Sequence, residues 1–86
     1  MKLTFTREAW DQFRYWQDND AATRRKLDRL IEECLRHPFE GTGKPEPLKG
    51  DFKGYWSRRI DREHRLVYRV VADDLEILSC RYHYQS

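Results

Sequence analysis

The chain has 86 residues, of which 37% are charged, 38% hydrophobic and 14% aromatic, and its formal net charge at pH 7 is +2. This length accommodates one domain over residues 1–86 and excludes an enzyme with a deep cleft between two domains. The aromatic content excludes a disordered tail, and no apolar run approaches the roughly 20 residues that a membrane span requires. The first residues also lack the apolar core of a signal peptide. We therefore expect a soluble, intracellular, globular domain with no membrane partner.

The first predicted elements are a short strand and a helix. Polar and apolar residues alternate over Lys2–Thr6, which predicts a strand whose inward residues are Leu3 and Phe5. Thr6 is a suitable N-cap for a helix that runs from Arg7 to about Asp18. An aromatic stripe at helical spacing follows, and we interpret it as core rather than as a ligand site: Trp10, Phe13 and Trp16.

A second helix is predicted over about Ala21–His37. Asp20 is its expected N-cap, and Pro38 is expected to end it, because proline cannot continue the helical hydrogen-bond pattern. Its apolar residues recur at i, i+3, i+4, i+7 and i+8, the spacing of a helix that buries one face: Leu27, Leu30, Ile31, Cys34 and Leu35.

Residues 40–54 form a long irregular connection, which contains all four glycines and two of the three prolines. A loop of this length inside a small domain is typically functional or disordered. Pro45 and Pro47 flank Glu46 and stiffen the backbone around this carboxylate. We therefore expect Glu46 to be held in a defined position.

From Tyr55 onward the hydrophobic period becomes two, which predicts three strands: Tyr55–Ile60, Arg65–Val71 and Leu75–Tyr84. Tight turns at residues 61–64 and 72–74 would join them. Together with the preceding elements this order predicts the α+β class, a small antiparallel β-sheet with the two N-terminal helices packed on one face.

The alternation also predicts which strand residues share a face. The residues expected under the helices are Trp56, Ile60, Leu66, Tyr68, Val70, Leu78, Cys80 and Tyr82. This arrangement requires an odd number of residues in both turns, because a one-residue slip in register reverses the faces. The opposite face would then present Arg59, Arg65, Arg69, Arg81 and His83.

Positive charge is concentrated in residues 44–69, where eight Lys or Arg residues stand against four Asp or Glu residues. A basic stretch of this kind is expected for an anionic partner. The alternative is a solvated basic face without a partner. Cys34 and Cys80 lie far apart and no His stands at metal-ligand spacing, so we expect buried, reduced thiols, no metal site and no cofactor.

The basic face and the loop together contain the side chains needed to cleave RNA without a metal ion. This reaction needs a base for the 2′-hydroxyl, an acid for the departing 5′-oxygen and cations for the charge that develops on the phosphate. Glu46, His83 and the pair Arg59 and Arg65 are side chains of these types, in that order.

Other residues of this region are suited to bind RNA. Lys44 and Lys49 can hold neighbouring phosphates, and Tyr84 offers a ring on which a base can stack. Each of these residues taken alone is more often a solvated surface group. From spacing alone, binding is favoured over catalysis for the set.

Several motifs nevertheless give the sequence a specific resemblance. They are the segments 38–41 (PFEG), 43–49 (GKPEPLK), 54–60 (GYWSRRI), 63–68 (EHRLVY) and 80–84 (CRYHY). With these motifs the chain resembles the YoeB/Txe toxins of the RelE-like superfamily over nearly its whole length. The resemblance implies a microbial-RNase-type fold and a bacterial, cytoplasmic toxin of a type II toxin–antitoxin pair. Such toxins enter the A site of the 70S ribosome and cut mRNA there without a metal ion, which stops translation.

The resemblance also implies partners and roles. A YefM-like antitoxin wraps the toxin and contacts operator DNA itself, and a homodimer is left as an open alternative. By position, Glu46 matches the general base, His83 the general acid and Arg65 the residue that stabilises the transition state. Arg59 and Lys49 match residues that assist at phosphate, and Tyr84 matches an aromatic residue that positions substrate.

The chain departs from the family pattern at two places. Gln85 and Ser86 follow the His-Tyr pair that usually closes the chain, and Phe52 stands where leucine is usual. Two alternatives to the nuclease remain: a ParE-like gyrase-poisoning toxin of the same fold, which lacks this Glu, Arg and His set, and an RNA-binding domain without turnover.

Overall fold

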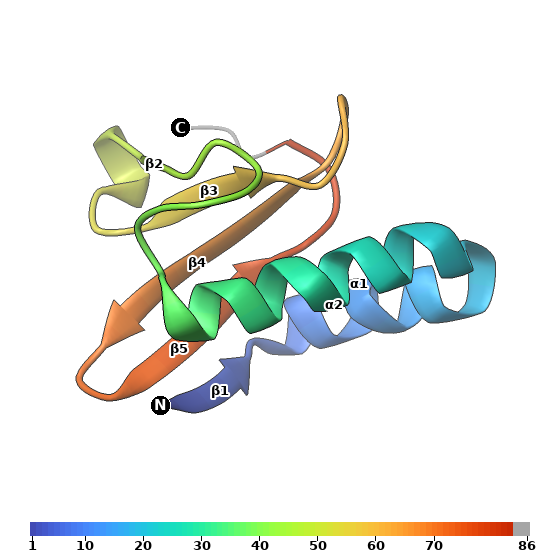
Figure 1. Ribbon diagram of the computed structural model, residues 1–86, viewed down its shortest axis with the longest axis horizontal. Helices are drawn as coiled ribbons and strands as arrows, with labels where there is room; N and C mark the ends of the chain where they lie inside the picture. Colours follow the sequence, from blue (N-terminus) through green and yellow to red (C-terminus); the bar gives the residue numbers. More distant parts are fainter. Residues whose placement is uncertain (84–86) are drawn as a thin grey trace.

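The computed structural model describes residues 1–83, which form two α-helices, one 3-10 helix and a five-stranded sheet (Figure 1). In chain order the elements are β1 (Lys2–Phe5), α1 (Arg7–Asn19), α2 (Ala21–Arg36), β2 (Glu46–Pro47), the 3-10 helix η1 (Gly50–Phe52), β3 (Trp56–Arg59), β4 (Arg65–Val71) and β5 (Asp74–Ser79). Neither α-helix in this part of the chain is long and apolar enough to cross a membrane.

The helix boundaries follow the capping residues that the sequence contains. The Thr6 hydroxyl accepts a hydrogen bond from the Ala9 N–H, and the Asp20 carboxylate accepts one from the Thr23 N–H. Asp20 also ends α1, because its own N–H donates to the Trp16 carbonyl. The predicted helices are therefore confirmed, to within a residue or so at each end.

The sheet has the strand order β1-β5-β4-β3-β2 and is mixed rather than wholly antiparallel. The expectation of an antiparallel sheet was wrong for β1, which pairs with β5 in parallel, Leu3 opposite Leu75. Alternation indicates a strand but not its direction. The hairpins β3–β4 and β4–β5 leave one edge on β3, which β2 takes, and one edge on β5, which β1 takes. The two-residue strand β2, inside the predicted loop, was not anticipated.

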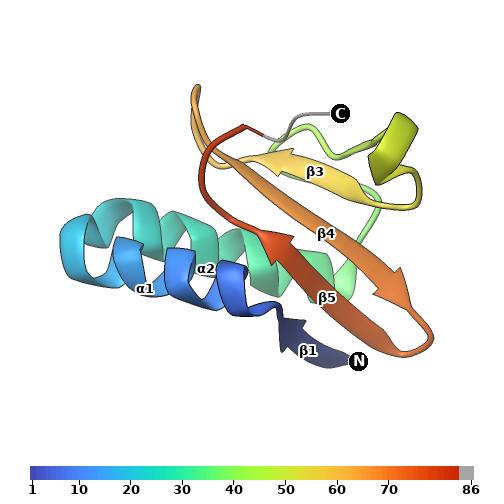
Figure 2. The same ribbon diagram turned by 180° about the vertical axis from the view of Figure 1, so that it is seen from behind.

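Both helices pack on one face of the sheet and run side by side there (Figures 1 and 2). The core combines residues of both helices with residues of the sheet face beneath them: Ala9, Trp16, Leu27, Leu30, Ile31, Cys34, Ile60, Leu66, Tyr68, Leu75, Ile77 and Cys80. Two of the core residues predicted for the first strand and the first helix lie elsewhere. Trp10 and Leu3 are each 42% exposed, because α1 turns Ala9, Gln12 and Trp16 inward and β1 is an edge strand.

The turns and faces of the hairpins agree only partly with the prediction. Arg59 pairs with Arg65 across β3–β4, so five residues, 60–64, separate them, an odd number as expected. Val71 pairs with Asp74, so the turn before β5 has only two residues, and the expected odd number was wrong there.

A β-bulge compensates for the even turn. Tyr68 pairs with Ile77, whereas the preceding Val67 pairs with Ser79, which leaves Leu78 as the extra residue of β5. On the turn side of the bulge the core residues of β5 are therefore Leu75 and Ile77. After the bulge the residues again face the predicted sides, and Cys80 is buried as expected. Tyr82, however, is 51% exposed instead of facing the core.

Candidate active site

A row of four residues crosses the sheet on the face that points away from the helices, here called the outer face. Glu46 pairs with Ser57, Ser57 with Val67, and Val67 with Ser79. Paired residues of neighbouring strands point to the same side, and their chain neighbours Leu66 and Tyr68 belong to the core under the helices. The Glu46 side chain therefore lies on the outer face, and it is exposed.

Arg59 and Arg65 occupy the next position along the same face. They are direct partners across β3 and β4, two residues beyond Ser57 and Val67. The Arg65 Nη1 donates to the Asp61 carbonyl at 2.9 Å and to the His64 carbonyl at 3.1 Å, which holds this guanidinium at the hairpin end. Strand spacing puts the Glu46 and Arg65 backbones on the order of 10 Å apart, because one strand lies between theirs.

The two predicted phosphate-binding lysines flank Glu46 in the chain. Lys44 has a φ of 52° and lies next to Arg59, whose N–H donates to the Gly43 carbonyl at 2.7 Å. Lys49 directly precedes η1, and both lysine side chains are exposed. The structure therefore brings Arg59 and Arg65 together at one end of the outer face, and the backbone of Lys44 lies beside that of Arg59.

His83 reaches this end by another route, through the segment that follows β5. The Trp16 Nε1 donates to the Cys80 carbonyl at 2.9 Å, and the Gln12 Oε1 accepts from the Cys80 N–H at 2.7 Å. Two residues later, the Arg65 N–H donates to the Tyr82 carbonyl at 3.1 Å. His83 therefore follows directly on the residue whose backbone is bonded to Arg65.

His83 is exposed and lines a cavity of about 280 Å³ between α1, η1 and the end of β5. The other lining residues are Glu8, Gln12, Phe52, Leu78, Ser79, Arg81 and Tyr82. Glu46 does not line this cavity, so the structure brings His83 next to Arg65 but does not join it to Glu46 in one pocket. Tyr84, the last of the predicted site residues, lies outside the described residues.

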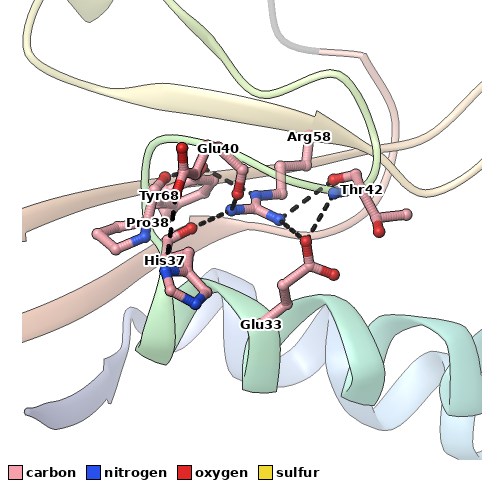
Figure 3. A network of polar contacts seen from close by, with 7 residues as sticks. All are labelled: Glu33, His37, Pro38, Glu40, Thr42, Arg58 and Tyr68. Carbon is pink, nitrogen blue, oxygen red and sulfur yellow. Dashed lines mark hydrogen bonds and ion pairs between the residues drawn. The ribbon is translucent and has the colours of Figure 1, made fainter.

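A buried arginine that the sequence analysis counted only as basic charge holds the loop that leads to Glu46. The Arg58 side chain is fully buried under the sheet (Figure 3). Its guanidinium donates to the Glu33 carboxylate of α2, to the Tyr68 hydroxyl, and to three loop carbonyls, those of His37, Glu40 and Thr42. The loop is thereby fixed to α2 and to β3.

The partners of Arg58 are themselves fixed. The Glu33 Oε1 accepts from the Thr42 N–H at 2.6 Å, and this bond, with the charge of Arg58, lowers the pKa of Glu33. The Tyr68 hydroxyl donates to the Pro38 carbonyl, and burial raises its pKa to about 12. The two-residue period of the strand could have identified Arg58 as a buried residue. It lies between Trp56 and Ile60, which were both expected to face the core, and alternate residues of a strand point to the same side.

The described residues, 1–83, contain no group of three or more His, Cys, Asp or Glu side chains arranged to hold a metal ion. Burial raises the pKa of the Cys34 thiol to about 11 and that of the Cys80 thiol to about 12. Both thiols are therefore protonated at neutral pH and poor nucleophiles.

Comparisons with known proteins identify the family of the chain. The family model of the YoeB-like toxins of bacterial type II toxin–antitoxin systems matches residues 5–84. The chain belongs to this family. Toxin YoeB of Escherichia coli strain K12 is 55% identical over 84 residues, which cover 98% of this chain and all of that protein.

Solved structures of family members have the same fold. The YoeB/ParE toxin from Agrobacterium tumefaciens has a TM-score of 0.95 at 53% identity and covers 98% of this chain and all of its own. YoeB in a heterotetrameric YoeB–YefM toxin–antitoxin complex from Staphylococcus aureus has a TM-score of 0.89 at 44% identity, with 98% of each chain covered. The predicted α+β fold of a RelE-like toxin is confirmed, and the chain is a toxin of a type II toxin–antitoxin system.

Proposed function

We propose that this YoeB-like chain is a ribosome-dependent endoribonuclease, a single toxin domain over residues 1–86 that cleaves mRNA in the ribosomal A site and so inhibits translation. One geometric relationship carries the proposal. Glu46, Arg59 and Arg65 share the outer face, and His83 follows the residue bonded to the Arg65 backbone. The proposed base and two cations thus share one face of the sheet, and the proposed acid follows in the chain on the residue that is bonded to Arg65.

The reaction begins with Glu46 as general base, which takes the proton of a ribose 2′-hydroxyl. The 2′-oxygen then attacks the adjacent phosphorus in line with the bond to the 5′-oxygen of the next nucleotide. Arg65 and Arg59 meet the negative charge that develops on the phosphate oxygens. His83 gives its proton to the departing 5′-oxygen, and the product carries a 2′,3′-cyclic phosphate, which water can open to a 3′-phosphate.

The remaining site residues bind rather than react. Lys44 and Lys49 lie on either side of Glu46 and are exposed, so they can hold the phosphates that flank the cleaved linkage. Tyr84 stacks on a base of the mRNA. Acid, base and phosphate-binding roles are all filled by side chains, and the mechanism uses no cofactor or metal.

The partners follow from the same family membership. The mRNA is presented by the 70S ribosome, and a YefM-like antitoxin neutralises the toxin and carries the contact with operator DNA. The complex from Staphylococcus aureus, a YoeB–YefM heterotetramer, supports this antitoxin class, and a YoeB dimer from the same organism supports a homodimer. The toxin would act in the bacterial cytoplasm, where its ribosomes are.

Mapping of transcript ends after induced expression tests the function, with the Glu46→Gln variant as control. The proposal predicts growth arrest and new ends at ribosome-occupied codons for the wild type, and neither for the variant. DNA-damage signalling without new mRNA ends would instead indicate a gyrase-poisoning toxin. Salt-sensitive binding to RNA without any product would indicate an RNA-binding domain.

A further inference from the structure

The peptide groups of Tyr82 are held from both sides by two consecutive residues of the chain. The Tyr82 N–H donates to the Nδ1 atom of His64 at 2.7 Å, and the Tyr82 carbonyl accepts from the Arg65 N–H at 3.1 Å. Tyr82 has a φ of 68°, the left-handed region that an aromatic residue rarely adopts without support. The two bonds supply that support.

The ring of His64 is itself fixed. Its side chain is only 12% exposed and packs edge-on against the Trp16 ring of α1, with the ring centroids 4.8 Å apart. Because Nδ1 accepts a hydrogen bond, the imidazole is neutral and carries its proton on Nε2, which lies 3.7 Å from the Glu63 carboxylate. The ring therefore has one orientation and one tautomer.

We propose that His64 is a positioning residue for the cleavage reaction: its neutral ring holds the Tyr82 peptide and thereby sets where the His83 imidazole lies relative to Arg65. This inference rests on the proposed function, because it assigns to His64 the placement of the general acid. His64 does not touch the substrate and acts only through the segment that carries His83.

The chain geometry makes the position of His83 sensitive to this bond. Tyr82 is exposed and its side chain is outside the core, so core packing does not fix the backbone at this residue. If the bond to Nδ1 is lost, Tyr82 can return to an extended backbone, and the next residue, His83, swings away from Arg65. A displacement of about 1 Å at a catalytic group can lower the rate by roughly 100-fold.

Two substitutions separate the hydrogen bond from the packing. His64→Asn retains an acceptor oxygen at the place of Nδ1 and cannot titrate, whereas His64→Phe retains a ring against Trp16 and has no acceptor. On programmed ribosomes we expect His64→Phe to lose roughly 10- to 100-fold in kcat with little change in KM, and His64→Asn to keep most of the activity. Equal activity of His64→Phe and the wild type would overturn the proposal.

Hydrogen exchange in the free proteins tests the contact without any activity. The Tyr82 amide should be protected in the wild type and in His64→Asn, and it should exchange freely in His64→Phe. A Tyr82 amide that exchanges freely in the wild type, or that stays protected in His64→Phe, would also overturn the proposal. If the Tyr82 amide is protected as expected but the wild type does not cleave mRNA, the proposed nuclease function is wrong, whereas the hydrogen bond between Tyr82 and His64 is confirmed.

Discussion

Arg59 and Arg65 are direct partners across β3 and β4, and both side chains lie on the outer face. Like charges placed opposite each other destabilise a sheet by roughly 0.2–1 kcal/mol. The Arg65 guanidinium is drawn to the carbonyls of its own hairpin, whereas Arg59 is exposed. The free protein therefore keeps an unfavourable pair at the place where the proposed mechanism needs to stabilise an anion.

Replacing Arg59 should stabilise the protein while it impairs cleavage. We expect Arg59→Gln to raise the free energy of unfolding by about 0.2–1 kcal/mol, because the substitution removes the repulsion between Arg59 and Arg65. Thermal unfolding measures this as a rise in Tm of up to several degrees. The matched control is Arg62→Gln in the adjacent turn, an exposed arginine with no arginine paired opposite it. An Arg59→Gln variant less stable than the control would contradict the prediction.

Removing Arg58 should destabilise the protein strongly. Arg58→Met leaves the Glu33 carboxylate and the carbonyls of Glu40 and Thr42 without their buried donor, and breaking a buried ion pair in this way costs about 3–5 kcal/mol. Glu33→Gln should cost much less, since an amide oxygen can still accept from Arg58 and from the Thr42 N–H. Urea unfolding of the two variants measures the difference, and similar losses for both would refute the assigned role of Arg58.

Acid should weaken the attachment of the loop to α2. The hydrogen bond from Thr42 and the charge of Arg58 hold the pKa of Glu33 below its ordinary value of 4.5. A carboxyl whose pKa is lower in the folded chain stabilises the fold above its unfolded pKa, and this contribution is lost as the pH falls through the folded pKa. The stability of the wild type should therefore fall below about pH 4.5 more steeply than that of Glu33→Gln. Parallel pH profiles would count against the Glu33 contact.

Relief of backbone strain far from the site should leave activity unchanged. Ala72, in the two-residue turn between β4 and β5, has a φ of 54°, which glycine adopts without the steric cost that a Cβ imposes. We expect Ala72→Gly to stabilise the protein by roughly 1 kcal/mol and to raise Tm by about 4–8 °C, with wild-type cleavage. A variant that is less stable than the wild type would show that this turn is not strained.

The parts of the fold that local chemistry controls could be predicted from the sequence. Thr6 and Asp20 each place a capping oxygen one residue before a helix, and Pro38 follows the end of the second helix, so these boundaries depend on a few adjacent residues. The direction of β1 and the bulge at Leu78 depend on which distant strand has a free edge and which residue stays unpaired. Neither feature leaves a signal in hydrophobic alternation.

The candidate site divides in the same way. Alternation was sufficient to place Arg59 and Arg65 on one face, because their position depends only on the register of one hairpin. The contributions of Arg58 and His64 were missed, since each depends on backbone groups that only the folded chain brings near: loop carbonyls for Arg58 and the Tyr82 N–H for His64. Arg58 alternates with the expected core residues Trp56 and Ile60, and this position already indicated a buried charge that would need partners.

Cleavage of mRNA on programmed ribosomes by purified Glu46→Ala and His83→Ala proteins, measured beside their ribosome binding, tests the assigned acid and base most directly. We predict that each substitution lowers the cleavage rate by about 10²- to 10⁴-fold and leaves the affinity for the ribosome nearly unchanged. The wild-type product should carry a 2′,3′-cyclic phosphate. Cleavage at the wild-type rate by either variant would contradict the mechanism.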